Sequence, residues 1–184
     1  RRRTLGLLLA VLLAAAPTVA SAQKPVEVTV AHFADLTGPI ATAAVPFELG
    51  LRDYFRWAQD DGNDPIPGLK VNLVWEDTGY SAERYVPTYK KFKDAGALIL
   101  INESSTANSV LGELLRADHI PMLSPGCGYI PGFFPRDVAK KGPSYIFFDR
   151  PTYPDFFAAI ATQFLSQWKA GGFPGKPKAM FITW

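Results

Sequence analysis

Residues Ala97–Ser109 read ALILINESSTANS, and this stretch decides how the chain folds. It begins with a short apolar run, Ala97–Ile101, which is typical of a buried strand, and it leads into a leucine-rich segment with helical spacing. Ser104, Ser105 and Thr106 therefore lie at the N-terminus of a helix. The unpaired N–H groups of a helix start favour an anion such as a carboxylate, but Ser and Thr are also preferred helix caps. Both interpretations stay open for this cluster.

Strand and helix patterns alternate along the rest of the chain. Alternating or β-branched apolar runs predict strands at Val26–Phe33, Leu69–Trp75, Ala97–Ile101, Ile120–Leu123, Tyr145–Phe148 and Lys178–Trp184. Helical spacing predicts helices at 47–58, 81–94, 105–117 and 155–170. Pro87 predicts a displaced or kinked start of the second helix, and Phe47, Tyr54 and Phe55 are expected in the core. The order predicts a doubly wound α/β domain with a parallel sheet.

The start of the chain has the layout of a secretory signal peptide. Arg1–Arg3 form a positive region, Leu5–Ala16 is an apolar run shorter than a membrane span, and Ala20–Ala22 is a small-residue cleavage site. We expect cleavage after Ala22 and a periplasmic protein that does not span the membrane.

The composition is that of a globular protein, with 48% hydrophobic and 20% charged residues among 184. The formal net charge is +2, and it becomes −1 without the three arginines at the N-terminus, so no nucleic-acid surface is expected. Cys127 is the single cysteine, which excludes an intrachain disulfide. His32 and His119 are isolated in sequence, so no metal site and no cofactor are predicted.

Ligands of doubly wound sheets bind beside the carboxyl ends of the strands. The segments predicted at those ends are 34–39, 76–80, 102–106 and 124–128. Asp77 is therefore a candidate ligand-binding acid, although capping a turn is the more usual role of Asp after a strand, and Asp35 has the same two alternatives. Tyr129 follows two glycines at the rim and is a candidate for stacking on a ligand.

Several motifs stand at matching places in the predicted fold. In chain order they are Leu36–Pro39 after the first strand, Gly50 and Asp53-Tyr54 in the first helix, Asp77 after the second strand, Ser104–Thr106 after the third, and Ile120–Gly126 at the fourth. This ordered set resembles type I periplasmic binding proteins, and most closely the leucine/isoleucine/valine-binding proteins of ABC transporters. The resemblance covers Val26–Trp184.

The resemblance implies a clamp of two α/β lobes that closes on an amino acid or a similar small polar ligand without catalysis and delivers it to a membrane permease. In the amino-acid binders the first lobe holds both charged groups of the ligand. By position, Ser105 and local backbone amides would take the carboxylate, and Gly126-Cys127-Gly128 would face the ammonium. The full set of predicted ligand-binding residues is Ser104, Ser105, Thr106, Gly126, Cys127, Gly128, Tyr129 and Asp77.

Three departures from the family pattern are expected to matter. Ala43 stands where the branched-chain binders have an aromatic residue over the ligand, and Gly128 stands where the family often has a hydroxyl. Family members are about twice as long as this chain. We therefore expect a signal peptide at 1–22, the N-terminal ligand-binding lobe at 23–149, and at 150–184 the hinge crossing with the first helix and strand of a truncated second lobe.

Two alternatives belong to other functional classes. The chain could be a ligand-sensing receptor module for amides or amino acids, which a regulatory gene beside its own gene would favour. An exported enzyme would use Cys127 as a thiol nucleophile and His32 as its base, although Cys127 lies in a glycine loop and not at a helix start that would activate it. Alkylation of Cys127 would abolish turnover in an enzyme and leave ligand binding intact in a clamp.

Overall fold

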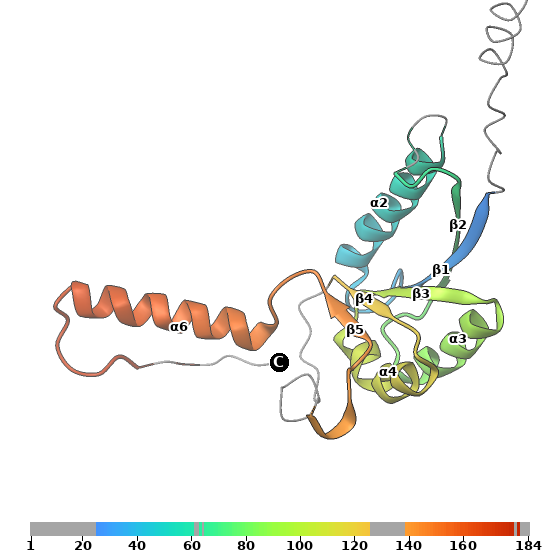
Figure 1. Ribbon diagram of the computed structural model, residues 1–184. Coiled ribbons are helices and arrows are strands. Elements are labelled where there is room, and N and C mark those ends of the chain that lie inside the picture. Colours follow the sequence, from blue (N-terminus) through green and yellow to red (C-terminus); the bar gives the residue numbers. More distant parts are fainter. Residues whose placement is uncertain (1–24, 61–62, 64, 126–138, 179, 181–184) are drawn as a thin grey trace, which may run out of the picture.

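A parallel sheet with helices on both faces forms the body of the protein (Figure 1). The computed structural model describes residues 25–60, 63, 65–125, 139–178 and 180. The strands are β1 (Val26–Ala34), β2 (Leu69–Asp77), β3 (Ala97–Asn102), β4 (Met122–Ser124) and β5 (Ile146–Phe148). The helices are α2 (Ala41–Gln59), α3 (Ala82–Asp94), α4 (Ser105–Asp118) and α6 (Tyr153–Ala170). All neighbouring strands are parallel, in the order β2-β1-β3-β4-β5, which confirms the predicted fold class.

The main core lies between the sheet and the helices α3 and α4. The ring of Phe33 on β1 packs against Phe92 of α3, with centroids 5.0 Å apart. The other fully or nearly fully buried members include Tyr85, Tyr89, Leu100, Leu111, Leu115, Met122 and Ile146. Each such side chain contributes roughly 1.5–3 kcal/mol through burial, so this face supplies most of the apolar stabilisation.

Helix α2 covers the opposite face of the sheet less completely (Figure 1). Leu123 and Phe147 point to this face and are 46% and 54% exposed. The prediction that Tyr54 lies in the core was wrong, because its side chain is 51% exposed. Tyr54 instead contacts the edge of the Phe55 ring and packs at a tilt against Trp57.

Three expectations about element boundaries need correction. Helix α3 begins at Ala82 in spite of Pro87, so its start is not displaced. Strand β4 begins only at Met122, because Pro121 lacks an N–H group and offers the sheet just its carbonyl oxygen, which accepts from the Leu100 N–H at 3.0 Å. Of the strand predicted at Lys178–Trp184, only Lys178 and Met180 are described, and neither lies in a strand.

Helix α6 extends away from the sheet (Figure 1). No residue of α6 is buried, and its apolar side chains Phe157, Ile160 and Phe164 are 59%, 63% and 45% exposed. None of the helices in the described part of the chain has the length and apolar character needed to cross a membrane.

Candidate ligand-binding site

The two loops that follow β1 and β2 are joined by Asp77. Its carboxylate accepts hydrogen bonds from the Thr37 hydroxyl at 2.8 Å, from the Thr37 N–H at 3.3 Å and from the Gly79 N–H at 3.0 Å. Gly38 lies so close to this turn, with φ +88°, that a Cβ there would stand 2.5 Å from the carbonyl oxygen of Gly79. Partial burial raises the pKa of Asp77, but these hydrogen bonds outweigh burial and hold that pKa below its usual value.

Asp35 fixes the position of Tyr80. The buried Asp35 carboxylate accepts from the Tyr80 N–H at 2.7 Å and from the Thr78 and Tyr85 hydroxyls. Tyr80 has φ +60°, a backbone conformation that costs a non-glycine residue roughly 1–2 kcal/mol. The bond to Asp35 supports this conformation, and the Tyr80 hydroxyl then lies 3.2 Å from Oγ of Ser105.

Ser104 caps helix α4. Its hydroxyl oxygen accepts from the N–H groups of Thr106 at 3.1 Å and Ala107 at 3.2 Å, and the residue is fully buried. Asn102 supports the same turn, since its side chain accepts from the Ser104 N–H and donates to Asn108. The cap interpretation therefore applies to Ser104, whereas Ser105 faces the opposite way, into a cavity.

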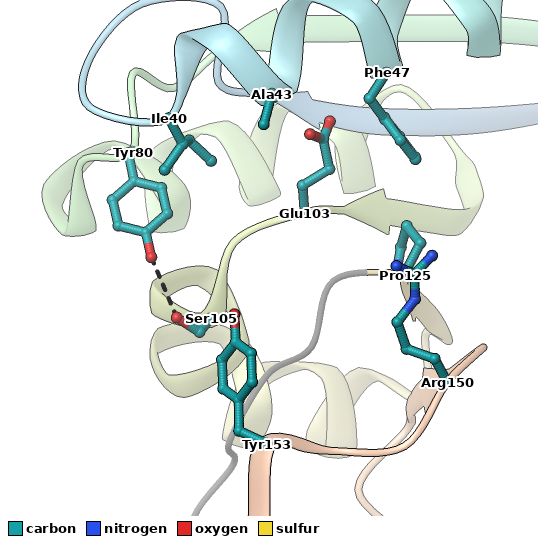
Figure 2. Close-up of a pocket in the computed structure, with 9 residues that line it drawn as sticks. All are labelled: Ile40, Ala43, Phe47, Tyr80, Glu103, Ser105, Pro125, Arg150 and Tyr153. Carbon is teal, nitrogen blue, oxygen red and sulfur yellow. Dashed lines mark hydrogen bonds between the residues drawn. The ribbon is translucent and has the colours of Figure 1, made fainter. Parts of the chain in front are cut away.

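The cavity lies at the carboxyl edge of the sheet and has a volume of about 320 Å³. Figure 2 shows its lining converging from the first turns of α2, from the segments that follow β2, β3 and β4, and from the segment that leads into α6. The described residues that line it are Ile40, Ala43, Phe47, Tyr80, Glu103, Ser105, Pro125, Arg150 and Tyr153. It stands beside the point where the strand order changes direction, between β1 and β3, which is the usual place for a ligand in such sheets.

A buried triad of ionisable side chains borders this cavity. Nδ1 of His32 on β1 lies 2.5 Å from Oε2 of Glu48 on α2, and Nε2 lies 3.1 Å from Oε1 of Glu103. His32 and Glu48 are 0% and 2% exposed, whereas Glu103 is 11% exposed and lines the cavity. The triad thus connects the buried interior to the cavity through Glu103.

The pKa values of His32 and Glu103 reflect burial and mutual contact. Burial alone lowers the pKa of His32, but the hydrogen bonds and charges of Glu103 and Glu48 outweigh it, so the pKa is raised above 6.5. The pKa of Glu103 is raised, first by burial and then by the charges of Asp35 and Glu48, although His32 opposes the shift.

The structure separates the predicted ligand-binding residues into three groups. Ser105 lines the cavity. Ser104, Thr106 and Asp77 are not among its described lining residues, and Ser104 and Asp77 use their polar atoms within turns. The predicted residues Gly126, Cys127, Gly128 and Tyr129 lie outside the described part of the chain.

Several lining residues were not predicted from the sequence. Glu103 and Tyr80 lie in segments expected at the carboxyl edge, so position after a strand was the signal that could have identified them. Phe47 was expected in the core, but it lines the cavity one helical turn after Ala43. Arg150 and Tyr153 come from the far end of the described chain, and no local pattern links them to β3. Arg150 pairs with Asp149 at 3.0 Å.

Several solved structures share this fold. A branched chain amino acid ABC transporter from Thermus thermophilus with bound valine shares 20% identity and a TM-score of 0.63 over 79% of this chain and 36% of its own. A possible leucine/isoleucine/valine-binding protein from Rhodopirellula baltica shares 19% identity and a TM-score of 0.59 over 83% of this chain and 38% of its own.

A third structure differs in its ligand. A solute binding protein of an ABC transporter from Rhodopseudomonas palustris in complex with 3,4-dihydroxybenzoic acid shares 12% identity and a TM-score of 0.53 over 68% of this chain and 32% of its own. The chain thus spans less than two fifths of the length of these structures. No curated protein matches it. Residues 27–183 match the sequence profile of the periplasmic binding proteins, and the chain belongs to this family.

Proposed function

We propose that the chain is the first ligand-binding lobe of an extracytoplasmic solute-binding protein that serves an ABC importer. The observation that carries this proposal is the cavity of about 320 Å³ at the carboxyl edge of the sheet. Its size suits a small ligand, and the hydroxyl groups of Tyr80 and Ser105 meet there beside the carboxylate of Glu103. The ligand in this proposal is an amino acid or a similar small polar molecule.

Ser105 is the proposed partner of a ligand carboxylate. Its hydroxyl lies at the first turn of α4, where the helix dipole favours a negative charge, and Tyr80 adds a second hydroxyl 3.2 Å away. Ser104 already accepts hydrogen bonds from two of the first N–H groups of α4, so these groups are not free to bind a carboxylate. The hydroxyls of Ser105 and Tyr80 therefore supply a larger part of the carboxylate binding than they would at a helix start without a cap. Backbone atoms of Gly126-Cys127-Gly128 and the ring of Tyr129 remain proposed contacts.

The fold alone does not select the ligand. Valine in one structural neighbour and 3,4-dihydroxybenzoic acid in another are both small carboxylic acids, but only valine has an amine. We therefore take a carboxylate as the shared feature and assign the rest of the selectivity to side chains of this chain and of a second lobe.

The division into lobes and the exported location belong to the same proposal. Residues 23–149 would form the first lobe, and 150–184 would cross to the second. The exposed apolar side chains of α6 support this division, because such a surface is stabilised when another domain covers it. Removal of residues 1–22 as a signal peptide would place the protein outside the cytoplasm, next to the permease of the importer.

His32 argues against the thiol-enzyme alternative. Both of its ring nitrogens lie within hydrogen-bond distance of carboxylates, so neither is left to accept a proton from Cys127. A binding role without chemistry is therefore the better explanation of this site.

A ligand screen of the complete gene product tests the proposal. Thermal shift against amino acids, amides and short organic acids should give a stabilising ligand, and calorimetry should then show saturable one-site binding. Modification of Cys127 with iodoacetamide should leave this binding largely intact. Absence of binding across the panel, or turnover that iodoacetamide abolishes, would remove the importer assignment.

A further inference from the structure

The triad of His32, Glu48 and Glu103 carries one more negative than positive charge. A neutral imidazole has one N–H group, yet both ring nitrogens of His32 face carboxylate oxygens, at 2.5 and 3.1 Å. Because an ionised carboxylate only accepts hydrogen bonds, the two contacts require one proton beyond those of a neutral imidazole and two carboxylates. Wherever that proton resides, two acids and one base then leave one net negative charge.

This charge is costly to bury without a partner. His32 forms an ion pair with Glu103, and the same ring also contacts Glu48. Arg150 lines the same cavity and pairs with Asp149. Oε1 of Glu48 is buried, and within the described residues no group donates a hydrogen bond to it. One imidazolium shared by two buried carboxylates cannot neutralise both, so a further positive charge close by would stabilise the cluster.

Only Glu103 connects the triad to the cavity. Glu48 and His32 are enclosed, whereas Glu103 lines the cavity together with Ser105 and Tyr80 (Figure 2). Hydrogen bonds to His32 limit the rotation of the Glu103 side chain, because His32 is itself held by Glu48 from α2. A positively charged group that enters the cavity would therefore meet a preorganised carboxylate.

We propose that Glu103 selects the ligand by binding its positively charged amine, and that His32 and Glu48 are positioning residues for this carboxylate. The inference rests on the proposed function and deepens it, since it names the ligand class of the same cavity. Glu103 and Ser105 line the same cavity, so a small ligand must carry both an amine and a carboxylate to bind both residues. An α-amino acid meets this requirement, and a simple carboxylic acid does not.

The experiment compares amine-containing probes with their des-amino counterparts on the complete gene product. Calorimetry is run with valine and 3-methylbutanoate, leucine and 4-methylpentanoate, and phenylalanine and 3-phenylpropanoate. At least one amino acid should bind, and its des-amino partner should bind roughly 10- to 100-fold more weakly, the range expected for a hydrogen bond to a charged group. This comparison uses the wild-type protein and needs no variant to fold.

The variant Glu103→Gln keeps the size of the side chain and removes its charge. It should weaken binding of the amino acid and leave the des-amino partner unaffected or better bound, so that the preference largely disappears. Glu83→Gln on the exposed surface of α3 is the matched control and should keep the preference. For the positioning role, ¹⁵N spectra of the His32 imidazole should change in Glu48→Gln and in Glu103→Gln but not in Glu83→Gln.

The outcomes separate the two proposals. A des-amino acid that binds as tightly as its amino acid, or a preference that survives Glu103→Gln, overturns the role of Glu103 while the binding function stands. Failure of all six probes to bind overturns the role of Glu103, whereas the binding function is overturned only when the wider panel of amino acids, amides and short organic acids also fails to bind. Loss of the preference for the amino acid in Glu103→Gln, together with its retention in Glu83→Gln, supports both proposals.

Discussion

The hydroxyl of Tyr80 lies 3.2 Å from the hydroxyl of Ser105, and this contact joins the loop after β2 to the first turn of α4. Tyr80 reaches this position only with φ +60°, which the buried Asp35 supports by accepting from its N–H at 2.7 Å. Backbone strain at a residue that lines a cavity is typical of functional sites. Two segments that are 25 positions apart thus place their hydroxyls on one side of the cavity.

Replacing Ser105 with Ala in the complete gene product should weaken ligand binding by about 1–3 kcal/mol, because a ligand carboxylate loses a donor in a partly buried site. Isothermal calorimetry measures the change. Ser109→Ala is the matched control, since Ser109 lies on the same helix, is exposed and donates only to the carbonyl of Ser105. Equal affinity of the wild type and Ser105→Ala would remove Ser105 from the site.

Replacing Tyr80 with Phe should cost about 0.5–1.5 kcal/mol of binding free energy, the typical net value of one neutral hydrogen bond. The effect should not add to that of Ser105→Ala, because the two hydroxyls contact each other. A double-mutant cycle by calorimetry measures this coupling. Additive effects would mean that the two hydroxyls act on the ligand independently.

Replacing Ser104 with Ala should lower the free energy of unfolding by about 1 kcal/mol, because the N–H groups of Thr106 and Ala107 lose their shared acceptor. Urea unfolding followed by circular dichroism measures the midpoint. Ser109→Ala serves again as the control and should unfold near the wild-type midpoint. An unchanged midpoint in Ser104→Ala would show that the cap contributes little.

The stability of the protein should fall as pH rises above 6.5. The folded state raises the pKa of His32 above its ordinary value of 6.5, so folding favours the protonated ring. The contribution of His32 is fully present below pH 6.5 and is lost as pH rises through the folded pKa. The raised pKa of Glu103 acts in the same direction, because the folded state retains a proton that the unfolded chain releases. Urea unfolding between about pH 6 and pH 9 should therefore show a decline that is smaller in His32→Gln.

Asp77 should make the stability of the protein sensitive to acid. Its pKa is held below 3.8 in the folded state, so its contribution is present above that value and is lost as pH falls through the folded pKa. Asp77→Asn should remove part of this acid sensitivity and lower stability near neutral pH by less than about 1 kcal/mol, since the carboxylate is only partly buried. Acid unfolding curves of the two proteins test this, and identical curves would contradict it.

The order of elements followed directly from the sequence, because hydrophobic periodicity and caps are local properties. Val26–Phe33 alternates along β1, and Ser81 stands at the N-cap position of α3, although its side chain makes no capping hydrogen bond. The carboxyl-edge position of Ser105 also followed, since every parallel strand ends at the same edge. The parallel sheet, the fold class and the family resemblance therefore needed no coordinates.

The tertiary structure decided which polar groups share a site. Ser104 and Ser105 are adjacent and chemically identical, yet α4 turns the first inward as a cap and the second toward the cavity. Glu48, His32 and Glu103 come from α2, β1 and the end of β3, and nothing in their spacing links them. Long-range contacts depend on how helices pack on the sheet, whereas strand and helix patterns depend on neighbouring residues. The sequence by itself therefore determined the scaffold and its binding edge, and packing alone placed a negative charge there.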